Sequence, residues 1–254
     1  MEFLAGFCEF LASVCVRSLF LSLHLIWKEE HNMDQFNKTF WDACANGDVT
    51  VVAAQIKQGV DVNYQNGEGR TALMRSAKRG YKDIVRLLVD NGADVNLLDG
   101  RGKTALMGAA KKGHKTICKK LIEAGADVNV ADNKGRTALQ RAAFQGMDRV
   151  IEELLKAGAE INTQDNEGRT PLMEACLAFK FDVIRQLVEA GADVNMQDKR
   201  GCTALMRAAY GGYTELVNYL LEHGADKEMT DQDGNKAIHY VREHCLAELK
   251  PILK

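Results

Sequence analysis

One short stretch contains residues suited to holding phosphate. "GRGKT" at residues 100–104 resembles the end of a phosphate-binding loop, in which backbone N–H groups and a lysine hold the phosphates of a nucleotide. Such a loop needs a glycine five positions before Gly102, but Leu97 stands there, and no long strand precedes it. We therefore interpret this stretch as the start of a short helix.

Two further groups of residues suggest metal chemistry. "DQDGN" at residues 231–235 resembles the start of a calcium loop, but the sixth position is Lys236 where glycine is needed, and the twelfth is Arg242 where glutamate is needed. His239, His244 and Cys245 could ligate a metal, but one terminal helix would supply all three, and no second pair of ligands is near in the sequence. We expect no metal site and no cofactor.

The elements that carry these residues recur along the chain. Five threonines, Thr71, Thr104, Thr137, Thr170 and Thr203, are spaced 33 residues apart, and the stretch "GRTALMRSAKRGYKDIVRLLVDNGADVN" is repeated with variations at that interval. A period of this size indicates a repeat architecture. Each unit reads as a turn, a helix capped by threonine, a glycine, a second helix with apolar residues at helical spacing, and another glycine. A single unit cannot bury its apolar side alone, so the units must stack into a solenoid.

The order of the turn, T-[A/P]-L, A-A, G, paired aliphatic residues and G-A-D-V-N resembles the ankyrin repeat over roughly residues 34–250. This resemblance implies an all-α solenoid of stacked helix-turn-helix units with short hairpin-like turns. The family usually has histidine after T-P-L, where this chain has Met74, Met107, Met173, Met206 and once Gln140. We therefore expect the network between turns to depend more on the backbone and on packing.

The pattern divides the chain into an apolar N-terminal segment (1–32) and a repeat domain (33–254). The domain comprises an N-terminal cap (33–65), five repeats (66–98, 99–131, 132–164, 165–197 and 198–230) and a C-terminal cap (231–254). The C-terminal cap keeps the turn and the first helix, which we expect to stop at Pro251.

Residues 1–32 lie outside the repeat pattern and are almost uniformly apolar, so we expect an apolar N-terminal helix there. Glu2 and the absence of a small-residue cleavage site disfavour a secretory signal, and Arg17 in the middle of the run disfavours a spanning helix. Three interpretations remain: a membrane anchor, a helix that packs on a partner, or an extension upstream of a natural start at Met33.

The seven cysteines are an odd number and include no C-x-x-C pair, which disfavours a disulfide framework or a zinc ribbon. They therefore fit a reducing compartment. Cys44 and Cys176 replace alanines of other repeats and should be buried, whereas Cys202 replaces Arg or Lys and should be the most exposed. No base stands beside Cys202 to activate it.

We find no catalytic nucleophile with its base and orienting group, so we expect that the protein is not an enzyme. The cysteine content favours a cytoplasmic location, and we expect membrane association only if residues 1–32 are an anchor.

The resemblance implies a protein partner bound at the turn tips and on the concave, first-helix side. Although the net charge is −2, cations recur at positions that should face this side, while many acids fall in the "GADVN" turns and on second helices. The candidate partner-binding cations are Arg70, Lys78, Arg79, Arg101, Lys103, Lys111, Lys112, Lys134, Arg136 and Arg169, and the candidate aromatic residues are Phe144, Phe179, Phe181, Tyr210 and Tyr213.

The fourth repeat departs from the pattern, because Phe179 stands where glycine should end the first helix. A non-glycine residue is strained in a left-handed conformation, so we expect that turn to change shape. Phe179 and Phe181 could be exposed anchors or could fold back into the core.

The leading hypothesis for function is a non-catalytic interaction module that binds an acidic segment and an apolar side chain of a partner protein. The alternative is a binder of nucleic acid or another phosphate-rich ligand through the same cations.

Overall fold

The computed structural model describes residues 35–254, and the prediction for the apolar segment 1–32 lies outside these residues. The chain divides into one compact unit that ends at Asp61 and another from Val62 to Lys254. The first contains a helix over residues 35–46 and α2 (Val49–Lys57), whose first turn is capped by the Asp48 carboxylate. The predicted domain boundary at residue 33 stays a prediction.

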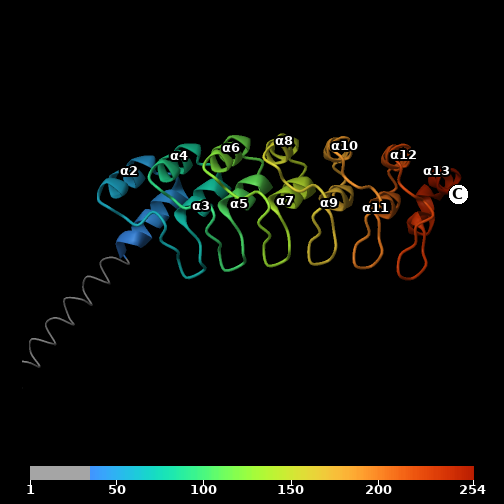
Figure 1. The fold of residues 1–254 in the computed structure, drawn as a ribbon, viewed down its shortest axis with the longest axis horizontal. Coiled ribbons are helices and arrows are strands. Elements are labelled where there is room, and N and C mark those ends of the chain that lie inside the picture. The colour runs from blue at the N-terminus through green and yellow to red at the C-terminus, as the bar shows by residue number, and fades with distance from the viewer. Residues whose placement is uncertain (1–34) are drawn as a thin grey trace, which may run out of the picture. The chain divides into compact units, whose positions relative to one another are not determined.

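The unit from Val62 to Lys254 is a row of five helix pairs followed by a closing segment (Figure 1). In Figure 1 the second helices form the upper row, the first helices lie below them, and the turns between repeats extend downward. The pairs are α3 (Ala72–Arg79) with α4 (Lys82–Asp90), α5 (Ala105–Lys111) with α6 (Lys115–Glu123), α7 (Ala138–Gln145) with α8 (Asp148–Lys156), α9 (Pro171–Leu177) with α10 (Phe181–Glu189), and α11 (Ala204–Gly211) with α12 (Thr214–Glu222). Residues 35–254 contain no strand, so the predicted all-α repeat solenoid is confirmed for this part of the chain.

The closing segment differs from the prediction. It consists of two 3-10 turns, η1 (Ala237–Tyr240) and η2 (Glu243–Cys245), and a helix, α13 (Leu246–Leu253). The expected stop at Pro251 was wrong, because the terminal helix α13 continues through that proline to Leu253. Pro251 lies in the last turn, where its missing N–H removes only one terminal helical hydrogen bond.

The threonines that set the period are the caps of the first helices. In every repeat the threonine hydroxyl accepts a hydrogen bond from the backbone N–H three residues later, at 3.2–3.4 Å. Pro171 occupies the first position of α9, where its missing N–H has no consequence. Gly80, Gly146 and Gly212 end α3, α7 and α11 in the left-handed conformation.

The turns between repeats are held by backbone hydrogen bonds and by side-chain amides. The N–H of Gly100 donates to the Glu68 carbonyl at 2.9 Å, and equivalent bonds link each later pair of turns. The amides of Gln65, Gln164 and Gln197 each donate to a carbonyl 33 residues further along, all at 2.9 Å. The backbone contribution agrees with the prediction, whereas the amide ladder was not predicted.

The core lies between stacked helices that approach closely through small side chains. Ala142 and Ala143 of α7 are fully buried, and α7 packs against both α5 and α9. Leu139 lies in the same helix with only 1% of its surface exposed. Cys44 and Cys176 are also fully buried, as expected from the alanines that they replace.

Leu139→Ala should destabilise the protein by about 2–5 kcal/mol, because it removes a buried side chain from a helix packed on both sides. Lys156→Ala is the control, since Lys156 is exposed and forms its ion pair with Glu152 at the surface. Urea denaturation of the two variants would measure the difference, and equal midpoints would contradict the packing described for α7.

Stability should also fall between about pH 4 and pH 2. The hydroxyl of Tyr240 and the backbone N–H of Asn235 donate to Asp231 and lower the pKa of its carboxyl from 3.8 to about 2. A carboxyl whose pKa is lower in the folded state stabilises the fold above its unfolded pKa, and this stabilisation is lost as the pH falls through the folded value. Denaturation of Asp231→Asn should show a weaker dependence on pH in this range; an unchanged dependence would exclude Asp231 as a source.

Candidate partner-binding surface

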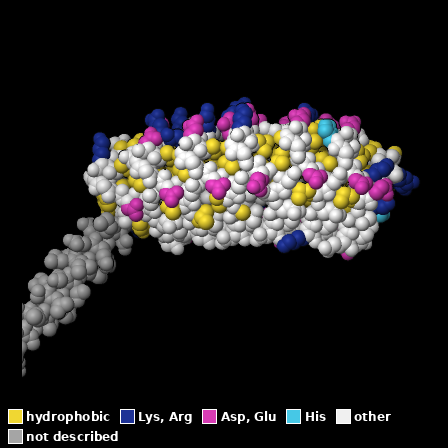
Figure 2. Space-filling view, viewed as in Figure 1, with side chains coloured by type: hydrophobic (Ala, Val, Ile, Leu, Met, Phe, Trp, Pro, Cys, Tyr) yellow, Lys and Arg dark blue, Asp and Glu magenta, His cyan; other side chains and the backbone are white. Residues whose placement is uncertain are grey.

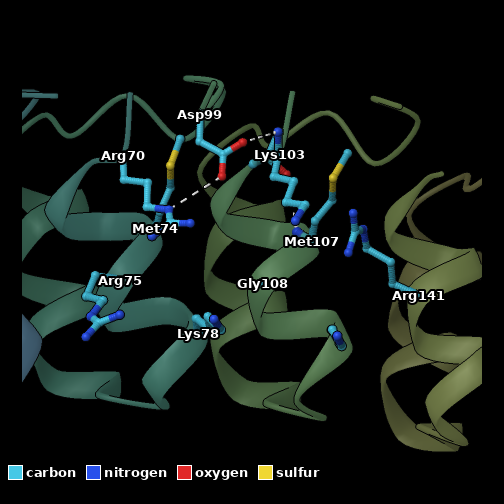
Figure 3. A pocket seen from close by; sticks show the side chains of 11 residues that line it. Arg70, Met74, Arg75, Lys78, Asp99, Lys103, Met107, Gly108 and Arg141 are labelled. Atoms are coloured by element: carbon cyan, nitrogen blue, oxygen red, sulfur yellow. Dashed lines mark hydrogen bonds and ion pairs between the residues drawn. The ribbon is translucent and has the colours of Figure 1, made fainter. Parts of the chain in front are cut away.

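A positively charged cavity of about 120 Å³ opens on the first-helix side of repeats one to three. Figure 3 shows that three neighbouring repeats contribute to it, with Lys78 on one helix, Gly108 on the next and Arg141 on the third. Its lining contains six cations and a single acid. We call it the basic pocket, and it is lined by Arg70, Met74, Arg75, Lys78, Asp99, Lys103, Thr104, Met107, Gly108, Lys111 and Arg141.

Gly108 provides the space for this pocket. The equivalent position carries a long side chain in each of the other repeats, namely Arg75, Arg141, Glu174 and Arg207. A β-carbon on Gly108 would lie 3.3 Å from the β-carbon of Lys78, so even an alanine would press on that lysine. The missing side chain therefore creates a recess bordered by the arginines of the two neighbouring repeats.

Two lysines of the basic pocket lie in a repulsive field. The pKa of Lys78 is lowered by partial burial and by the charges of Arg70 and Arg75, with further contributions from two nearby lysines. The pKa of Lys103 is lowered by partial burial and by the charge of Arg141, although Asp99 opposes the effect. A bound anion would relieve this repulsion, so the pocket favours negatively charged ligands.

The arginines that precede the capping threonines are partly neutralised within the protein. Arg70 pairs with Glu68 and lies 3.8 Å from Asp99. Arg136 lies 3.5 Å from Asp132, while Arg169 pairs with Asp165 at 3.4 Å and with Glu174 at 3.1 Å. These arginines therefore offer an external ligand less charge than their sequence pattern indicates.

Sequence reasoning missed the arginines inside the first helices. Arg141 is 8% exposed and pairs with Asp132, and Arg207 pairs in the same way with Asp198. Burial opposes the charged form of Asp132, but hydrogen bonds from two backbone N–H groups and the charges of Arg141 and Arg136 outweigh it and lower the pKa of that carboxyl. The signal was present, because each arginine stands nine residues after the turn aspartate that it contacts.

Cations also lie on the second-helix side, which corrects the expectation that they gather on one side. Figure 2 shows Lys and Arg side chains along the edge formed by the second helices. Many of these cations have an acidic neighbour: Lys115 lies 3.2 Å from Glu153, and Lys120 lies 2.8 Å from Asp90. At the turn tips, Lys134 and Arg200 line a cavity of about 490 Å³ whose lining also contains Asp165, Glu167 and Asp198.

A third surface cavity, of about 350 Å³, lies where repeats four and five meet the closing segment. We call it the aromatic pocket, and it is lined by Leu177, Phe179, Asp198, Arg200, Cys202, Met206, Arg207, Tyr210, Tyr240 and Arg242. The ring of Tyr213 lies 4.4 Å from that of Phe179, between centroids. The structure thus brings together three of the five aromatic candidates.

The remaining candidates lie outside both pockets. Phe144 is exposed in repeat three, and the half-buried Phe181 packs edge-on against Tyr219 of α12, so it belongs to the second-helix side. The candidate cations that line neither pocket are the exposed Arg79, Arg101, Lys112 and Lys134 and the half-buried Arg136 and Arg169. Lys112 still acts on the basic pocket through its charge on Lys78.

Phe179 corrects the prediction that its turn changes shape. It adopts the left-handed conformation, with φ of +54°, that glycine adopts elsewhere. Its N–H donates to the Cys176 carbonyl at 3.2 Å, and Gly113 makes the equivalent bond in repeat two at 3.1 Å. The turn is therefore conserved, and Phe179 itself bears the strain, which costs about 1–2 kcal/mol for a residue with a β-carbon.

Cys202 corrects another expectation, because it is 7% exposed and its Sγ lies 3.2 Å from the hydroxyl oxygen of Tyr240. The closing segment covers it, and that segment does not follow the repeat. Burial raises the pKa of the Cys118 and Cys176 thiols to about 12, so neither is a ready nucleophile.

Of the residues considered for metal binding, His239 is engaged in a local contact. A ring nitrogen of His239 accepts a hydrogen bond from the backbone N–H of Lys236 at 2.9 Å. Within residues 35–254 no three His, Cys, Asp or Glu side chains are grouped so that they could hold a metal ion. In the same range no helix combines the length and apolar character needed to cross a membrane.

Stacked helix pairs with capped turns and open charged surfaces define a helical-repeat scaffold. The family model for ankyrin repeats (3 copies) matches residues 40–132, 109–198 and 178–248, and the chain belongs to the ankyrin-repeat family. The crystal structure of the human ASB11 ankyrin repeat domain is similar, with a TM-score of 0.77 and 25% sequence identity over 85% of this chain and 97% of that one. In all, 657 chains of solved structures match, so the fold alone does not identify a partner. No curated protein matches the chain.

Lys78 should react faster than Lys156 with an acylating reagent. Both lysines are exposed, but the pKa of Lys78 is lowered, whereas hydrogen bonding to Glu152 and its charge raise the pKa of Lys156. More of Lys78 is therefore neutral and nucleophilic at pH 8. Quantitative peptide mapping after brief acetylation would compare the two rates, and equal rates would show that the field in the basic pocket is weak.

Proposed function

We propose that this protein is a non-catalytic interaction module that binds an acidic segment of a partner protein through the basic pocket. The observation that carries the proposal is a recess formed by three repeats and lined by six cations and one acid. Arg70 and Arg141 are paired with acids of the protein, so the lysines of the recess supply most of the charge for a ligand. Ankyrin repeats generally bind other proteins, and the family membership of this chain supports the same role. The described cysteines are free thiols, which fits the reducing, cytoplasmic setting that we propose with it.

The chemistry of the basic pocket suits an acidic segment. Met74 and Met107 provide an apolar floor, while Lys78 and Lys111 are exposed at its border. Carboxylates placed there would offset the mutual repulsion of the lysines, whereas a neutral segment would not. The aromatic pocket lies further along the same series of first helices, so one partner could contact both.

Nucleic acid is the alternative ligand, and the arrangement of charges favours it less. A phosphate backbone is bound by many cations that each neutralise one phosphate. Here acids interrupt the cations, since Asp99, Asp132 and Asp165 each lie within 4 Å of an arginine. The net charge of −2 also gives the chain no general attraction for polyanions.

Replacing Lys78, Arg79, Lys111 and Lys112 by alanine should slow association with an acidic peptide about tenfold at low salt, since charge governs the encounter rate. The probe is a 12-residue peptide rich in glutamate and without aromatic residues, and its association is followed by surface-binding kinetics at several salt concentrations. The matched control replaces Lys82, Arg86, Lys119 and Lys120 of the second helices and changes the net charge equally.

The proposal requires a larger effect from the first set of substitutions than from the control set. Equal effects would show that only overall charge matters and would remove the basic pocket from the interface. Tighter binding of a single-stranded oligonucleotide than of the peptide, with a steep salt dependence, would instead support the nucleic-acid alternative.

A further inference from the structure

The aromatic pocket is the place where exposed apolar side chains gather. Seven large apolar residues are exposed in the described part of the chain, and four of them belong to this one region: Leu177, Phe179, Tyr210 and Tyr213. Their exposed fractions run from 37% to 50%. Single exposed apolar residues are common on protein surfaces, but a cluster beside a cavity is typical of a binding site.

Two departures from the repeat pattern build one wall of this pocket together. Phe179 occupies a position where repeats one, two, three and five have glycine. Gly211 occupies the position before such a glycine, where the preceding repeats have Arg79, Lys112, Gln145 and Ala178. A β-carbon on Gly211 would overlap the ring of Phe179 and crowd that of Tyr213. Gly211 is therefore required for the position that Phe179 adopts.

Both departures oppose stability, so packing alone does not account for them. Phe179 is the only non-glycine residue with positive φ among residues 35–254. Gly211 lies in the last turn of α11, where glycine lowers helix propensity. In return the Phe179 ring stays 38% exposed at the border of the cavity. Strained residues of this kind are concentrated at functional sites.

The border of the pocket is positively charged. Arg200, Arg207 and Arg242 line it, and Asp198 is the one carboxylate in the lining, already paired with Arg207. The guanidinium carbon of Arg242 lies 4.2 Å from the centroid of the Tyr210 ring. Such stacking uses the flat face of the guanidinium, so its N–H groups at the edge can donate to a ligand.

We propose that the aromatic pocket receives an aromatic side chain of a partner protein that is flanked by carboxylates. The inference rests on the proposed function as a protein-binding module and assigns it a second, separate contact. The ring would pack against Phe179, Leu177 and Met206, and the flanking carboxylates would face Arg200 and Arg242. The cavity of about 350 Å³ lies at the lower end of the size range of pockets that hold small ligands.

Phe179→Gly separates binding from folding, because it restores the residue of the other repeats. Glycine adopts the left-handed conformation without strain, so the variant should unfold at the same temperature as the parent or a higher one. The probe is the blocked peptide Ala-Asp-Phe-Asp-Ala, and the readout is the NMR shift of the Met206 and Leu177 methyl groups during titration. We expect the affinity of Phe179→Gly to be at least tenfold weaker than that of the parent.

Matched controls test both parts of the site. Phe144→Ala removes an aromatic side chain of similar exposure (41%) outside the pocket and should leave the affinity unchanged. Gly211→Gln restores the residue type of repeat three and should weaken binding by displacing the Phe179 ring. A peptide in which lysine replaces both aspartates, and one in which alanine replaces the phenylalanine, should each bind at least tenfold more weakly.

Two results would overturn the inference: no methyl shifts with the aspartate peptide at millimolar concentration, or an unchanged affinity in a folded Phe179→Gly variant. Equal binding of the lysine peptide would overturn the assignment of flanking carboxylates. The basic pocket is tested with a peptide that lacks aromatic residues, so either proposal can fail while the other stands.

Discussion

The stack depends on one recurring interaction, in which the side chain at the start of each turn accepts two backbone hydrogen bonds. Asp132 accepts from the N–H groups of Lys134 and Arg136, and Asn66, Asp99, Asp165, Asp198 and Asp231 act in the same way. The turn then presents its N–H and C=O groups to the next turn, so the repeats can dock. Without this side-chain oxygen, two backbone N–H groups of each turn would lose their partner within the protein.

The residue nine positions after the residue that starts each turn determines whether a paired side chain or a recess lies on the surface beside that turn. In repeats three and five it is an arginine, which pairs with the aspartate and fills the space beside it. In repeat two it is Gly108, and a basic recess opens there. In repeat four it is Glu174, whose pKa is raised by burial despite the neighbouring Arg169, and in the closing segment it is Tyr240. This one position thus differs among the repeats and determines which side chain or recess lies beside each turn.

The sequence was sufficient for features that each repeat determines locally. The threonine caps, the glycines that end helices and the buried alanines could all be predicted, because each depends on residues within a few positions. The burial of Cys202 could not, since it depends on a closing segment that abandons the period. The pairing of Arg70 and Arg169 could not either, because side chains that look alike in sequence can point to different partners. At Phe179 the sequence predicted a conflict between the side chain and a left-handed backbone. It did not show that the turn would keep this conformation with a non-glycine residue.

The amide ladder between turns has a consequence for how such a chain can change over evolutionary time. Gln65 and Gln164 each bond to a carbonyl one period further on, and the backbone bonds between turns keep the same interval. A gene rearrangement that gained or lost a whole 33-residue unit would therefore leave the remaining donors facing suitable acceptors. A loss of a few residues inside a unit would misalign them. The partner-binding surface can in this way change by the gain or loss of whole repeats, while the hydrogen bonds that hold the stack together are kept.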